Sequence, residues 1–381
     1  MDDVLYLDTA RVGQMTPAVG RMLNGIVDLN HAIGSSLYFS DFLFGGYEAL
    51  PPQYQLAGLN PWQGIEILKD SFSRFVFGHS NSSVLFSSRS SSVVLLASQM
   101  IFSRCRNVLV TDLNWPNYGR ILESQIPNPS CNISRVSIER LVFDERLSAE
   151  ELSDYLIETF LSLECDGIFV PAVCNRGVVL PLERLLKALD SKIRFSVIDA
   201  AQAINHVDLS WASGLADIIV GGTQKWMSAY VPLSVGLFNR ESSREFIQDT
   251  LSRQLETQWQ VDPLLRFTQR PKTCLETVNL NSLFTAAAAL ADASELTENF
   301  LPIDPGSLPP EWIKSCSSHP TLSSNIQLLD TGHSLSGVDR QLMDCGIAAS
   351  ELQPGLIRIS AKSPLGDSEA ARFIQCLELY S

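Results

Sequence analysis

The chain has 381 residues, of which 45% are hydrophobic and 18% are charged, so it holds enough apolar material for a sizeable core. Its formal net charge of -14 argues against nucleic acid or an anionic membrane surface as the main partner. Apolar runs stay well below the length of a membrane span and the N-terminal stretch is acidic, so we expect no membrane span, no signal peptide and a cytoplasmic location.

The eight cysteines are scattered along the chain and form no C-x-x-C pair. A chain of this length does not depend on disulfides for stability, and several of the cysteines lie in apolar runs. We therefore expect reduced and mostly buried thiols. Cys345, in the apolar context of Met343 to Ile347, is expected to be buried too.

Residues 1–20 are expected to form an N-terminal arm that leads into a helix. Thr16 stands directly before Pro17, which places an N-cap residue and a first-turn proline at the helix start. Residues 31–60 are rich in aromatic side chains and prolines, so we expect a long irregular loop there. Such a loop forms either an active-site wall, a subunit contact or plain packing, and packing is the more common role.

Short apolar runs alternate with helical patterns from residue 62 onward. We expect helices at residues 62–77, 93–98 and 147–161, where apolar residues recur with helical spacing, the last with Ser148 and Glu151 as a capping box. We expect strands at residues 82–86, 108–112, 167–170, 197–199 and 218–220, with an edge strand around Val136 and Leu141-Val142. Almost wholly apolar strands separated by helices are typical of a doubly wound α/β sheet.

The pattern changes after residue 238. A polar helix at 242–257, an irregular stretch at 258–279, an alanine-rich helix at 282–296 and a proline-rich connection at 300–320 follow in order. Strands at 326–329, 346–348 and 356–360, with helices ending near 342 and 379, indicate a smaller α+β unit. We therefore divide the chain into an arm (1–20), a large domain (21–284) and a small C-terminal domain (285–381).

Two of the expected strand ends carry groups that could hold a phosphate and a ring. The serine turn from Ser87 to Ser92 joins a strand to a helix, where free N–H groups and hydroxyls can bind an anion. A turn that merely caps the helix is equally common. Trp115 follows the strand at 108–112 and could stack on an aromatic ligand, although filling a gap between helix and sheet is the commoner role of a lone tryptophan.

Two further strand ends carry an acid and an amine. Asp199 ends a buried run, where an acid needs a donor or a cation, so it either caps the next segment or pairs with a protonated ring nitrogen. Lys225 lies in an apolar, glycine-rich setting that lowers the pKa of its amine, as Schiff-base chemistry requires. A lone lysine is usually a surface residue. Because open sheets bind ligands at these strand ends, we expect Asp199 and Lys225 to hold one flat cofactor.

The pattern Asp199-x-x-Gln202, Asp208, Asp217 and Thr223-Gln224-Lys225-Trp226 resembles the class V aminotransferase and cysteine desulfurase family. These are pyridoxal 5′-phosphate (PLP) enzymes of fold type I, the aspartate aminotransferase-like fold. The resemblance covers most of the chain, from Tyr6-Leu7-Asp8-Thr9-Ala10 to Arg358-Ile359-Ser360. It implies a mixed, mostly parallel sheet in a large domain, a small α+β C-terminal domain and a homodimer.

The resemblance also implies a role for each matching residue. Lys225 would carry the cofactor as a Schiff base and then move the proton at the substrate Cα, and Asp199 would keep the ring nitrogen protonated. Arg358 would grip the substrate carboxylate, although a surface salt bridge is its alternative role. The other expected cofactor contacts are Gln202 and Asn175 at the ring's 3′-oxygen, Trp115 on the ring face, and Ser90, Ser91 and Thr223 at the phosphate.

Some positions depart from the family pattern. Arg89 replaces the glycine of the phosphate turn, so it either reshapes the turn or pairs with the phosphate. Gln224 stands where desulfurases have histidine, as in the alanine–glyoxylate aminotransferase branch. A desulfurase also needs an accessible cysteine on a mobile loop, a role that a buried Cys345 would not fill. Thr277 could reach the phosphate of a partner subunit.

We therefore predict a PLP-dependent enzyme whose small-molecule substrate is an amino acid or amine, with transamination as the default reaction. Elimination or C–S lyase chemistry, epimerisation and bond formation in specialised metabolism stay open, because PLP does the electronic work in each. A fold relative without catalytic activity is a further alternative, suggested by Arg89. A dinucleotide-binding protein is disfavoured, since no G-x-G-x-x-G follows an early strand.

Overall fold

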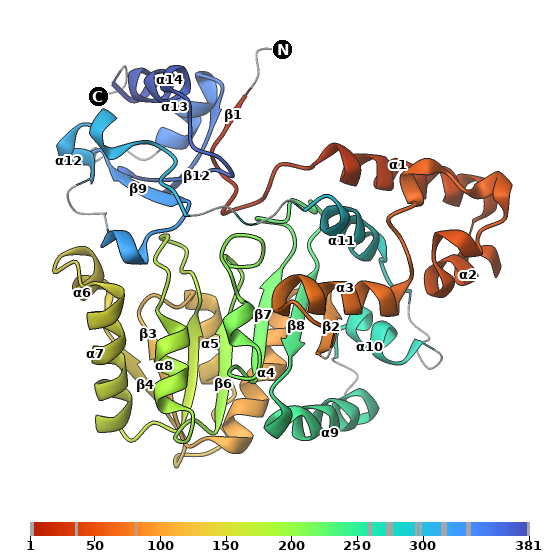
Figure 1. Ribbon diagram of the computed structural model, residues 1–381, viewed down its shortest axis with the longest axis horizontal. Helices are drawn as coiled ribbons and strands as arrows, with labels where there is room; N and C mark the ends of the chain where they lie inside the picture. Colours follow the sequence, from red (N-terminus) through yellow and green to blue (C-terminus); the bar gives the residue numbers. More distant parts are fainter. Residues whose placement is uncertain are drawn as a thin grey trace.

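A seven-stranded sheet forms the centre of the larger part of the molecule in the computed structural model (Figure 1). The structure describes residues 4–34, 37–80, 82–257, 261–271, 277–293, 296, 299–313, 318–332 and 337–378. The strands of this sheet are β2 (Ser83–Ser87), β3 (Asn107–Thr111), β4 (Asn132–Val136), β5 (Gly167–Pro171), β6 (Phe195–Asp199), β7 (Ile218–Gly222) and β8 (Ser234–Phe238). Their order is β2-β8-β7-β6-β5-β3-β4, and only β8 runs antiparallel to its neighbours. The expected mostly parallel sheet is confirmed.

Helices cover both faces of this sheet, which explains why its central strands are apolar along their whole length. One apolar cluster joins the sheet to α1 (Pro17–Ile33), α3 (Ile65–Phe77), α7 (Ala149–Ser162), α8 (Leu182–Leu189) and α11 (Asn281–Ala291). A second cluster on the other face joins it to α4 (Ser90–Arg104), α5 (Pro116–Ser124) and α9 (Glu241–Thr257). The predicted caps are present: Thr16 accepts a hydrogen bond from the Val19 N–H, and Ser148 forms a capping box with Glu151.

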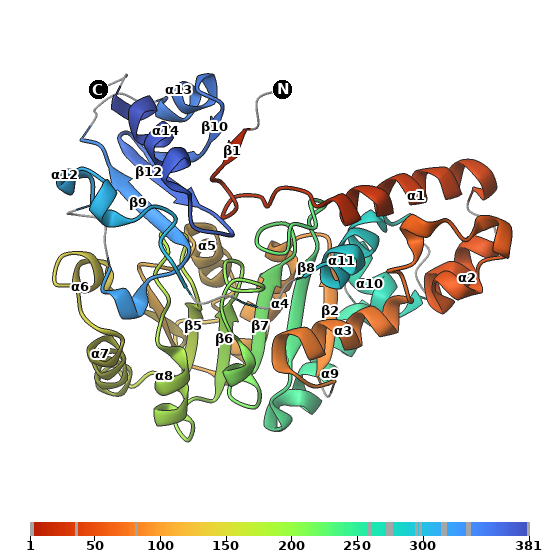
Figure 2. The ribbon, with the colours of Figure 1, turned by 45° about the horizontal axis from the view of Figure 1, so that its top comes forward.

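The C-terminal part builds a separate small sheet. Its antiparallel strands are β9 (Ile326–Asp330), β11 (Ser350–Gln353) and β12 (Leu356–Ser360), in the order β11-β12-β9. Its helices are α12 (Pro310–Ile313), α13 (Val338–Asp344) and α14 (Asp367–Glu378). The start of the chain belongs here too, because β1 (Leu5–Tyr6) pairs in parallel with β10 (Ile347–Ala348), as Figure 2 shows. The domain division at residue 285 stays a proposal.

Three segments differ from the expectation drawn from the sequence. The aromatic stretch expected to be a loop contains α2 (Leu37–Gly45), where buried Phe42 stacks on Phe284 of α11 at 5.5 Å between ring centroids. The stretch at 258–279 contains α10 (Pro263–Gln269), started by Asp262, whose carboxylate accepts the N–H groups of Leu264 and Leu265. Leu141-Val142 lies in α6 (Glu139–Phe143) rather than in the edge strand β4. The conformation of these segments depends on tertiary packing and on side-chain caps, and neither produces a periodic pattern of apolar residues in the sequence.

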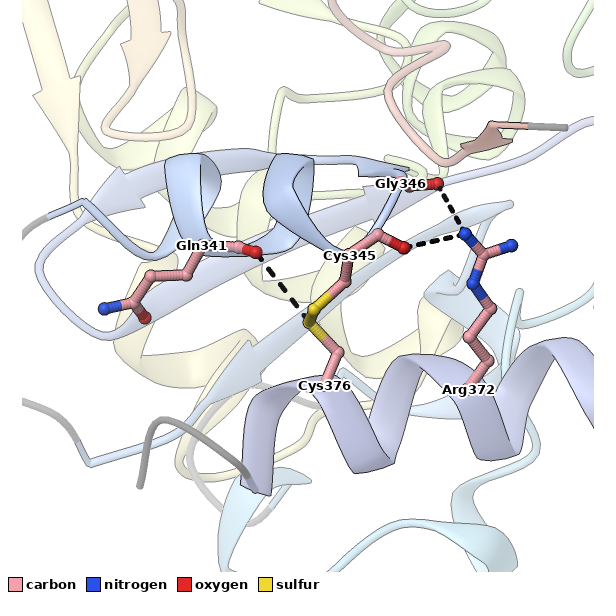
Figure 3. Close-up of a disulfide and its surroundings, with 5 residues drawn as sticks. All are labelled: Gln341, Cys345, Gly346, Arg372 and Cys376. Atoms are coloured by element: carbon pink, nitrogen blue, oxygen red, sulfur yellow. Dashed lines mark hydrogen bonds between the residues drawn. A yellow bond between two sulfur atoms is a disulfide. The ribbon is translucent and has the colours of Figure 1, made fainter. Parts of the chain in front are cut away.

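The expectation that all cysteines are reduced is wrong for one pair (Figure 3). Cys345 and Cys376 form a disulfide between the end of α13 and α14, with their Cα atoms 6.4 Å apart. Their 31-residue separation in sequence gives no sign of this pairing. Cys345 is half-buried rather than buried, and Cys105, Cys131, Cys165 and Cys174 are free. Cys274 and Cys316 lie outside the described residues.

None of the described helices is both long and apolar enough to span a membrane.

Candidate active site

A cavity of about 230 Å³ lies at the carboxyl ends of the parallel strands. Parallel β5 and β6 end together at Pro171 and Asp199, and the chain after β7 delivers Lys225 beside them. Six residues predicted from the sequence line this cavity, namely Trp115, Asn175, Asp199, Gln202, Lys225 and Arg358. Parallel strands bring residues that are far apart in the sequence to one edge of the sheet.

Asp199 is a buried acid with one backbone donor. Its Oδ1 accepts the N–H of Ala201 at 2.9 Å. Burial raises the pKa of Asp199 to about 6, against the lowering effects of that hydrogen bond and of the charge on Lys225. The carboxylate therefore sits where a cationic partner in the cavity would stabilise its charged form.

Lys225 faces the same cavity on a tight turn after β7. Burial lowers the pKa of Lys225 to about 8; the charge on Asp199 opposes this lowering and that on Arg358 adds to it. Near physiological pH, a larger fraction of this amine than of an ordinary lysine is therefore neutral, and the neutral form is the nucleophile. Ser228 and Tyr230 on the same turn have left-handed backbone angles, φ 58° and 64°. Such angles in residues other than glycine are often found at functional sites.

Gln202 is held in place by hydrogen bonds on both ends of its side-chain amide. Its Oε1 accepts the indole N–H of Trp226 at 2.9 Å, and its Nε2 donates to the Ala10 carbonyl at 2.8 Å. The amide N carries a second hydrogen. Gln202 therefore fixes both the N-terminal arm and the residue after Lys225 at the cavity wall, and it keeps one donor for a ligand.

His206 supports this arrangement, and sequence reasoning missed it. Its ring stacks on Trp226 at 3.6 Å between centroids, and its Nε2 accepts the Asn325 N–H at 3.1 Å. The proton therefore lies on Nδ1, which donates to the Gln202 carbonyl at 2.6 Å. Burial lowers the pKa of His206 to about 4, so the ring is neutral. The spacing of four residues after Gln202 was a usable signal, because it places both side chains on one helical turn.

Arg358 enters the cavity from β12 and is buried. Its Nη2 lies 3.4 Å from Asp8 Oδ1 and 3.5 Å from Ser350 Oγ, and its Nη1 donates to the Asn175 carbonyl at 3.5 Å. Ser350 Oγ in turn donates to Asp8 Oδ1 at 2.5 Å. The guanidinium is thus oriented by an acid that sequence reasoning left without a role, although Asp8 also follows a strand end.

The serine turn lies at the N-terminus of α4, beside the cavity rather than in its lining. Ser90 is the first helical residue and hydrogen-bonds Tyr118, which does line the cavity. Ser91 and the N-cap residue Arg89 are exposed, so both side chains are free to turn toward an anion. The turn is shaped by Asp262, whose carboxylate accepts both the N–H and the hydroxyl of Ser88.

The other predicted residues divide between buried and exposed positions. Thr223 is fully buried beside the lysine turn, and its hydroxyl has no hydrogen-bond partner within the described part of the chain. Trp115 is 44% exposed at the cavity mouth, which leaves its ring face available. Thr277 is exposed and outside the cavity lining. Cys174, which sequence reasoning did not select, lines the cavity, and burial raises the pKa of its thiol.

Comparison with known proteins identifies the architecture. No family model and no curated protein matches this sequence. A ureidoglycine–glyoxylate aminotransferase from Bacillus subtilis superposes with a TM-score of 0.64 at 13% identity, over 100% of this chain and 93% of that one. The chain has the fold type I architecture. Two further structures agree with this. A NifS-like protein has a TM-score of 0.65 at 15% identity, over 99% of both chains. An alanine–glyoxylate aminotransferase from Nostoc sp. has a TM-score of 0.62 at 14% identity, over 100% of this chain and 95% of that one.

Fold type I confirms the fold that the sequence resemblance implied. At these identities the likeness concerns the path of the chain, so the roles of individual side chains depend on the geometry of the cavity itself. That geometry brings together the acid, the amine and the guanidinium that the sequence pattern singled out.

Proposed function

We propose that this protein is a PLP-dependent enzyme that acts on an amino acid or amine, with transamination as its reaction. The observation that carries the proposal is the pairing of Asp199 and Lys225 across one cavity, each with a pKa shifted by burial toward its neutral form. The fold type I neighbours, which include aminotransferases, support the same reading.

The residues present fit PLP. The buried Thr223 hydroxyl, which has no hydrogen-bond partner among the described residues, would receive the phosphate together with Ser90 and Ser91 at the start of α4. The exposed face of Trp115 would pack on the ring. Asp199 would pair with the ring nitrogen, and the free hydrogen of the Gln202 amide would meet the 3′-oxygen. PLP bound there supplies an electron sink for the bonds at the substrate Cα.

This chain's residues would then do the positioning and the proton transfer. Lys225, as a neutral amine, can bond covalently to a carbonyl with loss of water. Once a substrate amine has taken its place on that carbon, the freed Lys225 amine can take a proton from the substrate Cα and return it elsewhere. Asp199 keeps its negative charge when a cation lies against it. Arg358, held by Asp8 and Ser350, offers charge-assisted hydrogen bonds to a substrate carboxylate.

Two observations favour transamination over sulfur transfer through a cysteine persulfide. Cys345 is bonded to Cys376, so it is not a free nucleophile. Cys174 lines the cavity, but burial raises the pKa of its thiol, and the thiol form is a poor nucleophile.

The cofactor is tested by the visible absorbance of the purified protein after addition of PLP. We expect a band near ~420 nm, as a carbonyl condensed with a lysine amine gives, and we expect Lys225→Ala to lose it. Lys187→Ala is the matched control, because Lys187 is a surface lysine paired with Glu183. Wild-type protein that stays colourless would contradict the proposal.

Transamination is tested by incubating the coloured protein with single amino acids and analysing the products. A keto acid together with pyridoxamine phosphate supports transamination. Ammonia or a thiol without pyridoxamine phosphate would contradict it and indicate elimination instead.

The homodimer and the cytoplasmic location also stay proposals. Sedimentation of the purified protein tests the homodimer.

A further inference from the structure

We propose that Arg11 makes the enzyme selective for amino acids that carry a second acidic group, a carboxylate or a phosphate, in the side chain. Arg11 and Arg358 both line the cavity that contains Asp199 and Lys225. The inference rests on the proposed function, because it names the substrate class of the same site.

The backbone of Arg11 is fixed at the cavity by contacts on both sides. The N–H groups of Arg11 and Val12 both donate to the Asp8 carbonyl, which forms a tight turn. On one side of this turn, the Ala10 N–H donates to Ser360 Oγ at the end of β12 at 2.9 Å. On the other, the Ala10 carbonyl accepts the Gln202 amide at 2.8 Å. The position of the Arg11 Cα relative to Arg358 and Gln202 is therefore set by the fold.

The side chain of Arg11, in contrast, is free to meet a ligand. It is 71% exposed, and its one ion pair within the described residues is a 3.9 Å contact with Asp8 Oδ2. The other oxygen of Asp8, Oδ1, already accepts hydrogen bonds from Arg358 and Ser350. The guanidinium groups of Arg11 and Arg358 thus share the single carboxylate of Asp8. The one negative charge of Asp8 balances only one of these two positive charges at the cavity.

The two arginines differ in depth, which separates their roles. Arg358 is buried and lies against Asp8 and Ser350, so it suits the carboxylate that every amino acid has next to the reacting carbon. Arg11 lies nearer to solvent on a flexible stem, so it suits a group whose distance from that carbon varies. A cation at this place also disfavours substrates with basic side chains, because like charges brought together raise the free energy.

The experiment compares alanine, aspartate, glutamate, phosphoserine and lysine as amino donors for the wild-type enzyme, Arg11→Gln and Arg11→Glu. We expect the wild type to prefer the acidic donors. In Arg11→Gln, kcat/KM for acidic donors should fall about tenfold to a hundredfold, mainly through KM, while alanine is little affected. Arg11→Glu should improve lysine relative to glutamate. Arg340→Gln, an exposed arginine on α13, is the control and should change none of these ratios.

The outcomes separate this inference from the proposed function. If the ~420 nm band is absent in the wild type, the proposed function fails. If the band is present but Arg11→Gln lowers kcat/KM equally for alanine and glutamate, or for neither, the role of Arg11 is overturned and the cofactor assignment stands. A preference among aspartate, glutamate and phosphoserine shows whether the second group is a carboxylate or a phosphate.

Discussion

At the scale of single residues, the neutral state of His206 has a measurable effect on stability. The ring uses both nitrogens, one as donor to Gln202 and one as acceptor from Asn325, and it stacks on Trp226. Protonation would turn the acceptor nitrogen into a donor facing another donor. The folded protein therefore resists protonation of this ring down to a pKa of about 4, against 6.5 for the unfolded chain.

Between pH 6.5 and 4 the unfolded state binds the His206 proton and the folded state does not, so stability falls as the pH falls. The loss should approach roughly 3 kcal/mol at the acid end. Asp199, whose pKa is raised to about 6, acts in the opposite direction over part of this range. His206→Gln isolates the effect, because it removes the titrating ring and leaves Asp199. Urea unfolding at several pH values measures it, and parallel curves for both proteins would refute the assignment.

Some residues of the site could be predicted from the sequence, and others could not. Asp199, Lys225 and Arg358 could be predicted, because each follows or lies in an apolar strand run and a strand end is where such groups meet. The roles of Asp8 and Asp262 could not, because each acts through a contact across the fold, Asp8 with Arg358 and Asp262 with Ser88. Such partners are set by tertiary structure, and a short motif does not contain them.

At the scale of elements, the N-terminal arm passes so close to the lysine turn that only a glycine fits. The Gly13 N–H donates to the Gln224 carbonyl at 2.7 Å. A Cβ on Gly13 would lie 1.9 Å from the Lys225 carbonyl oxygen, which is far inside van der Waals contact. The arm and the turn therefore form one packed unit, and the position of Lys225 depends on a residue more than two hundred positions earlier.

Gly13→Ala should push the arm away from the lysine turn. We expect a stability loss of about 2 kcal/mol or more and a weaker affinity for PLP, measured by urea unfolding and by titration of the visible band. Gly20→Ala, within α1, is the matched control, since a Cβ there would lie 4.0 Å from Met15 Cε, and alanine should be neutral or slightly stabilising at this position. Equal behaviour of the two variants would contradict the packing described.

Elements with strong periodicity could be predicted, and those that depend on a contact between distant segments could not. Helices α3 and α7 and strands β2, β3, β5, β6 and β7 all follow from apolar spacing. Helix α10 has seven residues and starts at the side chain of Asp262, which also accepts a hydrogen bond from the Ser88 N–H in the serine turn, a contact between segments far apart in the sequence. Helix α2 is mostly apolar and has only Ser40 and Asp41 as polar residues, a pattern that does not distinguish a buried helix from a loop packed on the core.

At the scale of the whole molecule, the alternation of strands and helices predicts a doubly wound sheet, but the strand order depends on pairings between distant segments. The antiparallel strand β8, inserted between β2 and β7, and the pairing of β1 with β10 have no sequence signal of their own. The Cys345–Cys376 bond is a further long-range feature, and it links the two helices that cover the small sheet.

Because of the Cys345–Cys376 disulfide, we expect the free energy of unfolding to depend on redox conditions. Replacing Cys345 and Cys376 together by serine should lower the free energy of unfolding by about 2–4 kcal/mol, because the unfolded chain regains the freedom of a closed loop. A reductant should lower the urea midpoint of the wild type and leave the double variant unchanged. Cys131→Ser is the control, since Cys131 is free and half-buried. Alkylation of both thiols in unreduced wild-type protein would contradict the bond.

The pairing of β1 with β10 also sets the order in which the protein can be completed during synthesis. Leu5 leaves the ribosome long before its partner Ile347, and Asp8 leaves it long before Ser360, with which it forms a β-bridge. A growing chain can therefore form the sheet that carries Asp199 and Lys225 well before Arg358 exists. Until translation has passed β12, Asp8 lacks its contacts with Ser350, Arg358 and Ser360, and the cavity beside Lys225 lacks the guanidinium of Arg358.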